Sequence, residues 1–285
     1  MTCVLLHHGA AKLALRPDVG GSVEGLWLGD LAILRSVAPG TLTSVKQSAS
    51  YPFVPYSNRL AQAQLHWQGA TYSLSPNFAP EPHAIHGVGW LGAWAVKQTE
   101  DDFAHLTYLH TADASTQNAW PFAFDAWQTF RLADNSLEMT VGMTNRSSHV
   151  APAGLGWHPY FVKRSQSQLS FDAAGRWEMD AAKLPTTFST SGGLRCSGTA
   201  LDVDHCYDGW AGTVHLRDEC VDVRVTSALK RLVVYTTPSH DSIAIEPVSH
   251  VNNAMNQANP FALGVQLLQP GQSYAASMTV EMHAL

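Results

Sequence analysis

The sequence predicts an all-β protein that folds as one large antiparallel β-sandwich. Short apolar runs recur along nearly the whole chain, and within them apolar and polar residues alternate at period two. The alternation is clearest over residues 122–132, where Phe122, Phe124 and Phe130 fall on one face. Turn residues separate the runs at close intervals, whereas helical periodicity is nearly absent. Together these observations favour many short strands over helices.

Each expected strand lies between turn signals. Two pairs are expected to form hairpins, Val23–Leu28 with Leu31–Leu34 around Gly29-Asp30, and Leu65–Trp67 with Thr71–Leu74 around Gln68-Gly69-Ala70. The other expected strands are Val4–Leu6, Leu13–Leu15, Trp94–Val96, Phe103–Leu109, Phe122–Leu132, Leu137–Thr144, Leu169–Phe171, Thr213–Leu216, Val221–Val225, Leu232–Tyr235, Ile243–Ile245 and Tyr274–Met282. Two polar segments, Thr187–Ser197 and Leu201–Trp210, are expected to be loops. Asn253–Asn259 is expected to be a short helix that ends at Pro260.

Length and composition fit a single domain that spans residues 1–285. With 45% hydrophobic and 14% charged residues the chain can bury a large core, and disorder is not expected. No linker and no repeat of fixed period divides it. The formal net charge is -6 and no block of five or six basic residues occurs, so nucleic acid is not an expected partner. We expect a neutral, polar small molecule as the ligand, and a monomer or homodimer.

The four cysteines carry no metal-binding or redox signature. Cys3, Cys196, Cys206 and Cys220 form no Cys-x-x-Cys pair and show no metal-ligand spacing. The sequence shows no signal peptide and no apolar run long enough to cross a membrane. We therefore expect reduced thiols, a cytoplasmic location and no membrane contact, with Cys206 as a small buried apolar residue.

The segment 154–161, Gly-Leu-Gly-Trp-His-Pro-Tyr-Phe, supplies the leading catalytic candidate, His158. Glycines let a backbone approach a ligand closely, and the proline fixes the turn after the histidine. Trp157, Tyr160 and Phe161 could form an apolar wall with polar tips, as in many small-molecule sites. A core histidine in an aromatic cluster fits these residues equally well.

The segment 51–60 contains two prolines and places Asn58 next to Arg59 in an apolar setting. The guanidinium of Arg59 cannot lose its proton and offers a planar set of donors, which could bind ring and hydroxyl oxygens of a sugar. The alternative is a structural arginine that pairs with a carboxylate.

The segment 81–90 contains His83 and His86, three residues apart. This spacing would suggest metal ligation on a helix, but one proline and two glycines make a helix implausible, so no metal site is expected. A loop histidine held by glycines suits hydrogen bonding to a ligand. In the segment 201–210, three aspartates could bind Ca²⁺, although their spacing matches no EF-hand loop. A single aspartate that binds two adjacent hydroxyl groups is at least as plausible.

Glu246 ends the apolar strand Ile243–Ile245. A carboxylate in that setting loses hydration unless it has partners or a function. Apolar surroundings raise the pKa of a carboxyl group and make it a better base near neutral pH. With His158, Glu246 would form an acid/base pair from distant parts of the chain. The sequence contains no nucleophile elbow, phosphate loop or dinucleotide fingerprint.

In their order along the chain, these motifs resemble those of the aldose 1-epimerases, also called galactose mutarotases. The motifs are Asn58-Arg59-Leu60, a Trp-x-Gly-x-x-Tyr-x-Leu stretch from Trp67 to Leu74, His86-Gly87 near Trp90, His158-Pro159-Tyr160-Phe161, Asp204-His205 and Ile245-Glu246-Pro247. The resemblance covers roughly Leu13 to Met282. It implies a galactose-mutarotase-like β-sandwich (supersandwich), no cofactor, and interconversion of the α and β anomers of a free sugar.

The resemblance also implies roles for individual residues. By position these are Glu246 as general base, His158 as general acid, His86 as the second active-site histidine, Arg59 as the substrate-binding arginine and Asp204 as the hydroxyl-binding aspartate. Asn58 is expected to bind substrate beside Arg59. Stacking of Trp157 against the sugar is a separate hypothesis that does not come from the resemblance.

Three sequence details depart from the galactose enzymes. The second motif reads His-Gly-Val-Gly-Trp, no Asn-Leu follows the Tyr-Phe pair, and Pro-Val-Ser-His follows Glu246. These details resemble a shorter bacterial branch whose members act on varied aldoses, so the sequence does not specify galactose.

Three other functions remain open from the sequence. A hexose-6-phosphate 1-epimerase of the same fold needs further cations for the phosphate, and Arg131 or Arg164 would have to supplement Arg59. A non-catalytic carbohydrate-binding sandwich would keep the aromatic residues without needing the acid/base pair. A glycosidase needs two carboxylates that face the bond, and Asp204 with Glu246 is the only visible pair.

Overall fold

The computed structural model describes residues 3–285, and nearly all of its regular structure is antiparallel β-strand. The predicted all-β sandwich is therefore confirmed. Helical structure within residues 3–285 is limited to short 3₁₀ turns, which are η1 (Val45–Gln47), η2 (Ala61–Ala63), η3 (Gly198–Ala200) and η4 (Ala254–Asn256).

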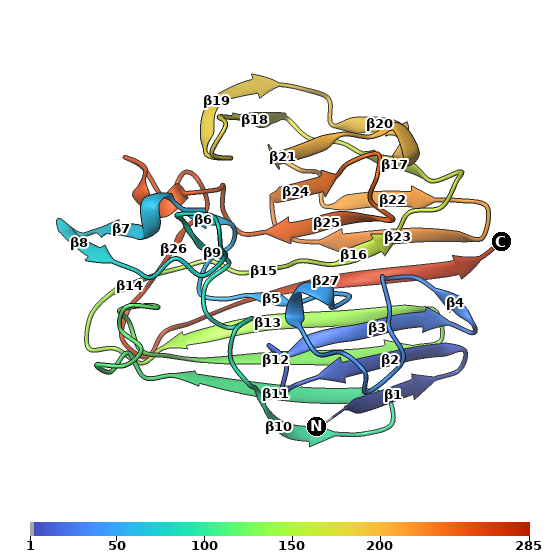
Figure 1. Ribbon diagram of the computed structural model, residues 1–285, viewed down its shortest axis with the longest axis horizontal. Helices are drawn as coiled ribbons and strands as arrows, with labels where there is room; N and C mark the ends of the chain where they lie inside the picture. The colour runs from blue at the N-terminus through green and yellow to red at the C-terminus, as the bar shows by residue number, and fades with distance from the viewer. Residues whose placement is uncertain (1–2) are drawn as a thin grey trace.

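One layer of the sandwich is a nine-stranded sheet that runs from the bottom of the molecule to near its top in Figure 1. Its strands, in spatial order, are β10 (Ala95–Thr99), β11 (Phe103–His110), β12 (Phe124–Ala133), β13 (Ser136–Asn145), β27 (Ser273–Ala284), β23 (Val221–Ser227), β22 (Thr213–Arg217), β17 (Gln168–Phe171) and β20 (Leu194–Ser197). On β12 the predicted alternation is observed, because Phe124 and Phe130 are buried while Arg131 is exposed.

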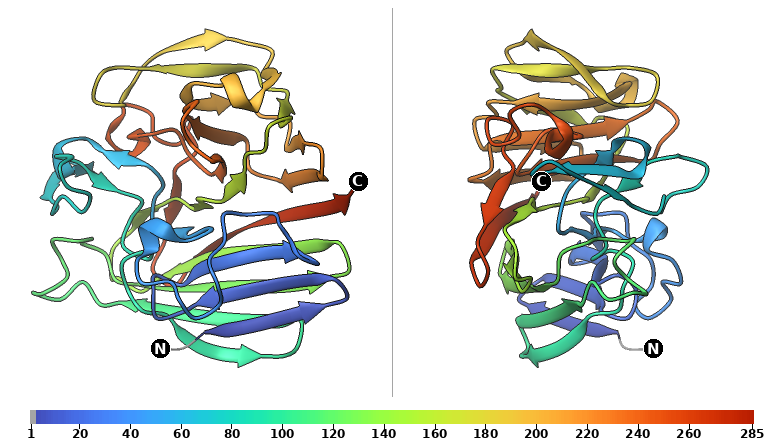
Figure 2. Two further views of the ribbon diagram at one scale, coloured as in Figure 1. Left: turned by 45° about the vertical axis from the view of Figure 1, so that its right-hand side comes forward. Right: turned by 90° about the vertical axis from the view of Figure 1, so that its left-hand side faces the viewer.

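Two sheets cover the inner face of this layer. The first has four strands, β1 (Val4–His8), β2 (Ala11–Arg16), β3 (Ser22–Leu28) and β4 (Leu31–Ala32). The second has eight strands, β19 (Pro185–Thr190), β18 (Gly175–Met179), β21 (Val203–Asp208), β24 (Arg231–Thr236), β25 (Ser242–Val248), β15 (Gly156–Trp157) and β5 (Pro52–Phe53), with β16 (Tyr160–Val162) also paired to β25. Figure 2 shows the four-stranded sheet against β10–β13 and the larger sheet against the other half.

Side-chain contacts join the layers in both halves. In one half, Gln128 on β12 donates a hydrogen bond of 2.9 Å to the carbonyl oxygen of Gly21, next to β3. In the other half, the rings of Phe171 on β17 and Tyr207 on β21 meet edge to face at 4.8 Å. Three small two-stranded sheets complete the fold: β6 (Arg59–Leu60) with β9 (Ala84–Ile85), β7 (Gln64–Trp67) with β8 (Ala70–Ser73), and β14 (Ala151–Ala153) with β26 (Gln266–Leu268).

Both expected loops contain strands, so those two predictions are wrong. Thr187–Ser197 includes the end of β19 and all of β20, and Leu201–Trp210 includes β21. β19 is an exposed edge strand rich in Thr and Ser, so it lacks the apolar alternation that marks a half-buried strand. β21 forms because it pairs with β24 along its whole length, a long-range interaction that local pattern does not reveal.

The short helix expected over Asn253–Asn259 is also absent, apart from η4. The turn ends at Gln257, whose backbone is extended with φ of -90° and ψ of 159°, and it is preceded by Asn253, which has a left-handed backbone with φ of 54°. The side-chain oxygen of Asn253 instead accepts hydrogen bonds from the Ala61 backbone N–H at 3.1 Å and from Asn256 at 2.8 Å. Tertiary hydrogen bonds therefore replace the helix here.

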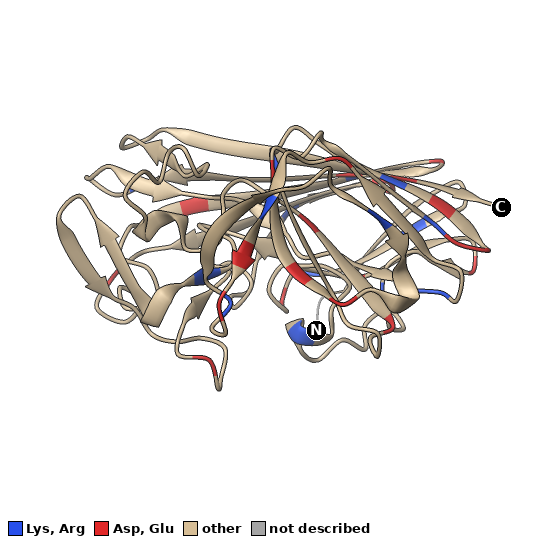
Figure 3. Ribbon diagram, turned by 90° about the horizontal axis from the view of Figure 1, so that it is seen from above, with Lys and Arg blue, Asp and Glu red and all other residues tan. Residues whose placement is uncertain are grey.

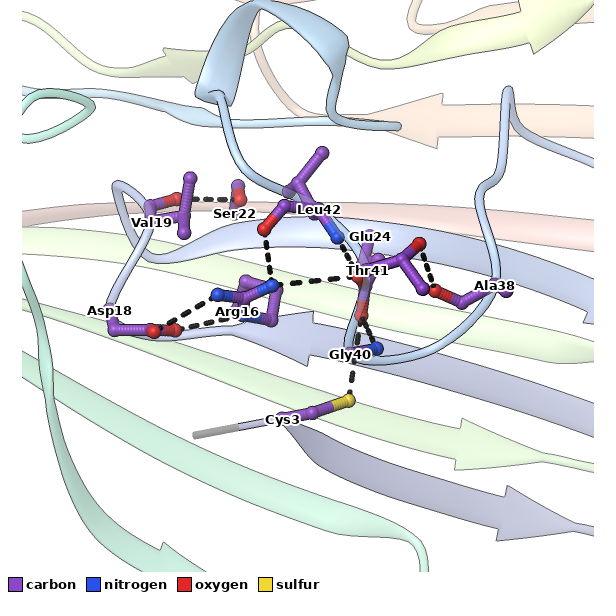
Figure 4. Close-up of polar contacts among 10 residues, drawn as sticks. All are labelled: Cys3, Arg16, Asp18, Val19, Ser22, Glu24, Ala38, Gly40, Thr41 and Leu42. Atoms are coloured by element: carbon purple, nitrogen blue, oxygen red, sulfur yellow. Dashed lines mark hydrogen bonds and ion pairs between the residues drawn. The ribbon is translucent and has the colours of Figure 1, made fainter. Parts of the chain in front are cut away.

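A buried charged network anchors the segment that follows β4 (Figure 4). Glu24 is completely buried, and its carboxylate accepts backbone hydrogen bonds from Gly40 at 2.8 Å and Leu42 at 2.6 Å. Arg16, only 2% exposed, lies 3.7 Å from Glu24 and also bonds Asp18 and the Leu42 carbonyl oxygen. Because every charge has partners, the network is compatible with burial and fixes the chain that leads to η1.

We expect Glu24→Ala to lower the free energy of unfolding by about 3 kcal/mol or more, because it removes one of the two carboxylates beside the buried Arg16 and leaves two backbone N–H groups without an acceptor. Urea denaturation followed by circular dichroism measures this loss. Asp30→Ala, at an exposed turn, is the matched control and should stay within about 0.5 kcal/mol of the unmodified protein. Equal midpoints for the two variants would contradict the assigned role of the network.

Candidate active site

A cleft of about 740 Å³ opens where the eight-stranded sheet meets the chain around β6 and β9. Six of the seven site residues expected from the sequence line it: Asn58, Arg59, His86, His158, Asp204 and Glu246. They come from five separate stretches of the chain, so the fold brings these stretches together.

The register of β25 places His158 opposite Glu246. β15 and β16 both pair antiparallel with β25, through Gly156 with Val248 and Tyr160 with Ala244. His158 lies midway between Gly156 and Tyr160, and Glu246 lies midway between Ala244 and Val248 on β25. The side chains meet with 3.2 Å between His158 Nε2 and Glu246 Oε1.

Burial dominates the electrostatics of this pair. Glu246 is 2% exposed and His158 is 7% exposed. Desolvation raises the Glu246 pKa well above its usual value, helped by nearby Asp204 and opposed by Arg59. Desolvation, followed by the positive charge of Arg35, lowers the His158 pKa to about 3. The pair therefore titrates as one unit that holds a single proton over a wide pH range.

His86 is held as a neutral hydrogen-bond donor. Its Nδ1 accepts the backbone N–H of Asn58 at 3.1 Å, which assigns the ring proton to Nε2. The imidazole stacks on Phe53 at 4.2 Å, and burial places its pKa well below the usual value. The following Gly87 has φ of 70°, and a Cβ there would lie 2.2 Å from the Val54 carbonyl oxygen. In the His-Gly sequence, the histidine therefore provides the hydrogen-bonding ring and the glycine allows the close approach to Val54.

Arg59 fits both roles that the sequence left open, a structural pair with a carboxylate and a donor to a ligand. Its Nε and Nη2 donate to Glu81 at 2.7 Å each, a bidentate pair that also lowers the Glu81 pKa. Its Nη1 lies 3.3 Å from the side-chain oxygen of Asn58. A guanidinium has five N–H groups, so two remain to bind a ligand in the cleft. Glu81 also lines the cleft, and it was missed because nothing in its local sequence marks it as the partner of Arg59.

Asp204 projects from β21 and pairs with Lys183, whose Nζ lies 3.2 Å from its carboxylate. Lys183 belongs to the turn between β18 and β19 and is about half exposed, so this ion pair contributes little to stability. Lys183 and Lys46 both line the cleft, and sequence analysis singled out neither. In the view of Figure 3, Lys and Arg positions are interspersed with Asp and Glu positions.

The stacking hypothesis for Trp157 is wrong. Trp157 is completely buried and is not among the residues that line the cleft. It precedes His158 on the chain, and side chains of successive extended residues point to opposite sides of the sheet. Phe161 is likewise fully buried, whereas Tyr160 lines the cleft. The other aromatic rings that line it are Tyr51, Phe78 and Tyr235.

The two arginines considered for a phosphate lie outside the cleft. Arg131 stacks on Phe103 at 4.6 Å, and Arg164 pairs with Asp218 at 2.8 Å. Over residues 3–285 the structure contains no group of three or more His, Cys, Asp or Glu side chains placed to hold a metal ion. In the same range no helix has the length and hydropathy needed to span a membrane.

Similar sequences are found in Escherichia coli K12. Uncharacterized protein YphB is 36% identical over 178 residues, which cover 62% of this chain and 58% of that protein. The match therefore spans less than two thirds of the length of YphB. Uncharacterized protein YihR is 26% identical, over 78% of this chain and 75% of that protein.

Solved structures share the fold over the whole chain. A protein of E. coli K12, provisionally named an aldose 1-epimerase, aligns with a TM-score of 0.89 and 25% identity, covering 100% of this chain and 99% of that one. A galactose mutarotase-like protein from Clostridium acetobutylicum aligns with a TM-score of 0.86 and 18% identity, covering 99% and 95%. The second likeness shows the fold alone.

The family of this chain is established by a comparison of its sequence with a family model. A sequence model of the family described as aldose 1-epimerase matches residues 2–281, nearly the whole chain. This match confirms the resemblance inferred from the order of the motifs. The chain belongs to the aldose 1-epimerase family.

Proposed function

We propose that the protein interconverts the α and β anomers of an aldose, with Glu246 as the base and His158 as the acid. The observation that carries this proposal is the buried 3.2 Å pair of imidazole and carboxylate in the cleft. Ring opening of a hemiacetal needs one proton acceptor at the C1 hydroxyl and one donor at the ring oxygen, and this pair supplies both with one shared proton.

The reaction follows from where that proton can go. Glu246 accepts the proton of the C1 hydroxyl while His158 donates its proton to the ring oxygen, O5. The C1–O5 bond breaks with its electron pair left on O5, and C1 becomes an aldehyde carbon. Rotation about C1–C2 presents the other face of the carbonyl. On closure His158 takes the proton back from O5 as O5 attacks C1, and Glu246 returns its proton to the carbonyl oxygen.

The remaining cleft residues suit binding and charge stabilisation. The Nε2–H of His86 and the two remaining N–H groups of Arg59 are preorganised donors for sugar oxygens, including an O5 that gains negative charge. Asp204 can accept hydrogen bonds from two adjacent hydroxyl groups. Asn58 keeps Arg59 in place, since its side-chain oxygen also accepts the Arg59 backbone N–H at 2.9 Å.

A hexose-6-phosphate 1-epimerase is the second candidate. The observation that favours it is the presence of Lys46 and Lys183 in the lining of the cleft, since ammonium groups bind phosphate. Lys183 already pairs with Asp204, so only part of this charge is available. A non-catalytic carbohydrate-binding module is less favoured, because it gains nothing from burying an acid/base pair that loses hydration.

We expect the purified protein to accelerate anomer exchange of at least one aldose. Polarimetry and NMR exchange spectroscopy across a panel of free hexoses, free pentoses and hexose 6-phosphates measure the rates. Acceleration confined to the phosphates would select the second candidate. If no member of the panel exchanges faster than in buffer, the binding module is favoured instead.

His158→Asn and Glu246→Gln should each reduce kcat at least about 10²-fold, because each removes one of the two proton-transfer groups while preserving size. The matched controls are His215→Asn and Glu138→Gln, which alter exposed residues on the nine-stranded sheet and should leave kcat unchanged. Near-normal kcat in either cleft variant, with circular dichroism showing a native fold, contradicts the assignment of acid and base.

Glu81→Gln should raise KM about tenfold and change kcat less. The substitution weakens the bidentate hold on Arg59, so the guanidinium is less well oriented for both the bound sugar and the transition state. Initial-rate kinetics on the best sugar of the panel separate the two constants. A large fall in kcat with unchanged KM would show that Arg59 acts in the transition state alone.

A further inference from the structure

The ring of Tyr160 contacts both His158 and a guanidinium that the proposed mechanism does not use. The imidazole of His158 stacks on Tyr160 with 4.3 Å between ring centres and 24° between planes. The Arg35 guanidinium carbon lies 3.8 Å from the same ring centre. Both groups therefore lie within contact distance of the Tyr160 ring. The Tyr160 hydroxyl also lies 3.3 Å from His158 Nε2.

Backbone groups hold Arg35 in this position. Its guanidinium donates to the Ser48 carbonyl oxygen at 3.1 and 2.5 Å and to that of Lys46 at 3.0 Å. Its own backbone N–H donates to the Tyr160 carbonyl oxygen at 2.7 Å. Among the ion pairs of residues 3–285, none involves Arg35, so its positive charge has carbonyl dipoles but no carboxylate beside it.

We propose that Arg35 and Tyr160 are positioning residues that hold the His158 imidazole against Glu246 and lower the affinity of this imidazole for the shared proton. This inference rests on the proposed function for its catalytic meaning, but the effect on the proton is a property of the protein itself. Stacking fixes the plane of the imidazole, and a cation that contacts the same aromatic ring disfavours a second positive charge nearby.

Arg35 is the fixed charge among the groups that face His158. The titratable groups around the imidazole are Tyr51, His86, Tyr160 and Glu246. Burial raises the Tyr51 pKa well above its usual value and that of Tyr160 to about 12, and it lowers the pKa of His86, so these three stay neutral near pH 7. Arg35 is the leading cause of the lowered His158 pKa after burial.

The arrangement makes chemical sense for ring opening. An imidazolium that binds its proton less tightly is a stronger acid, which favours transfer to the weakly basic ring oxygen. Glu246, with its raised pKa, is at the same time a stronger base toward the C1 hydroxyl. Arg35 therefore makes His158 a stronger acid without contacting the sugar directly.

Arg35→Gln tests the effect of the charge, and Arg35→Lys is the matched control that keeps it. Without the positive charge the pair should bind its shared proton more tightly, so the alkaline limb of kcat/KM should move up by about 1 pH unit, a tenfold change in proton affinity. Arg35→Lys should keep the limb near its original position. Superimposable profiles for Arg35→Gln and the unmodified protein would overturn the proposal.

NMR gives a readout that needs no substrate. The imidazole ¹⁵N resonances of His158, assigned by their absence in His158→Asn, can be followed between pH 5 and 10. Arg35→Gln should shift their alkaline transition upward by the same amount as the kinetic limb. If no sugar is turned over but the resonance shifts, the proposed function fails and the inference stands. An unshifted resonance overturns the inference whatever the activity.

Tyr160→Phe and Tyr160→Leu separate the ring from the hydroxyl group. Phe keeps the stack, so kcat should fall less than about threefold, whereas Leu removes it and kcat should fall about tenfold or more with a smaller change in KM. Equal kcat values for the two variants would contradict positioning by the ring. Arg35 is only half-buried, so the Arg35 variants test the proposal even if Tyr160→Leu does not fold.

Discussion

The proposed acid/base pair depends on the antiparallel register between β25 and the two short strands β15 and β16. Because Gly156 pairs with Val248 and Tyr160 pairs with Ala244, His158 between the short strands faces Glu246. Backbone hydrogen bonds thus decide which imidazole meets which carboxylate. A shift of the register by one residue would turn one of the two side chains to the other face of the sheet.

Burial of that pair has a cost that the surroundings offset. Each group loses hydration in the cleft, and its pKa moves toward the neutral form. One shared proton keeps the pair neutral overall, which makes burial tolerable and at the same time leaves an acid and a base in contact. The two neighbouring cations act differently: Arg59 is paired with Glu81 and acts on Glu246, whereas Arg35 is held only by carbonyl oxygens and acts on His158. The positive charge that acts on the His158 imidazole is therefore that of Arg35, which has no carboxylate beside it.

The sandwich explains why such a site can be both rigid and accessible. Its inner faces form a continuous apolar core, so the strands that carry Asp204 and Glu246 have little freedom to move. The chain that follows β4 is fixed separately by the Arg16–Glu24 network, and it supplies the carbonyl oxygens that hold Arg35. Strands carry Arg59, Asp204 and Glu246, whereas His86 and His158 lie in the segments that connect strands.

The sequence alone determined the fold class, the strands with strong alternation such as β12, and the residue types of the site, because period-two patterns are local and the order of the motifs can be read directly along the chain. It did not reveal β21, which depends on pairing with β24, or Glu81 as the partner of Arg59. It also suggested that Trp157 stacks against the sugar, whereas Trp157 is buried away from the cleft. Only the tertiary structure decided these points, since register and packing join residues whose positions along the chain carry no mutual signal.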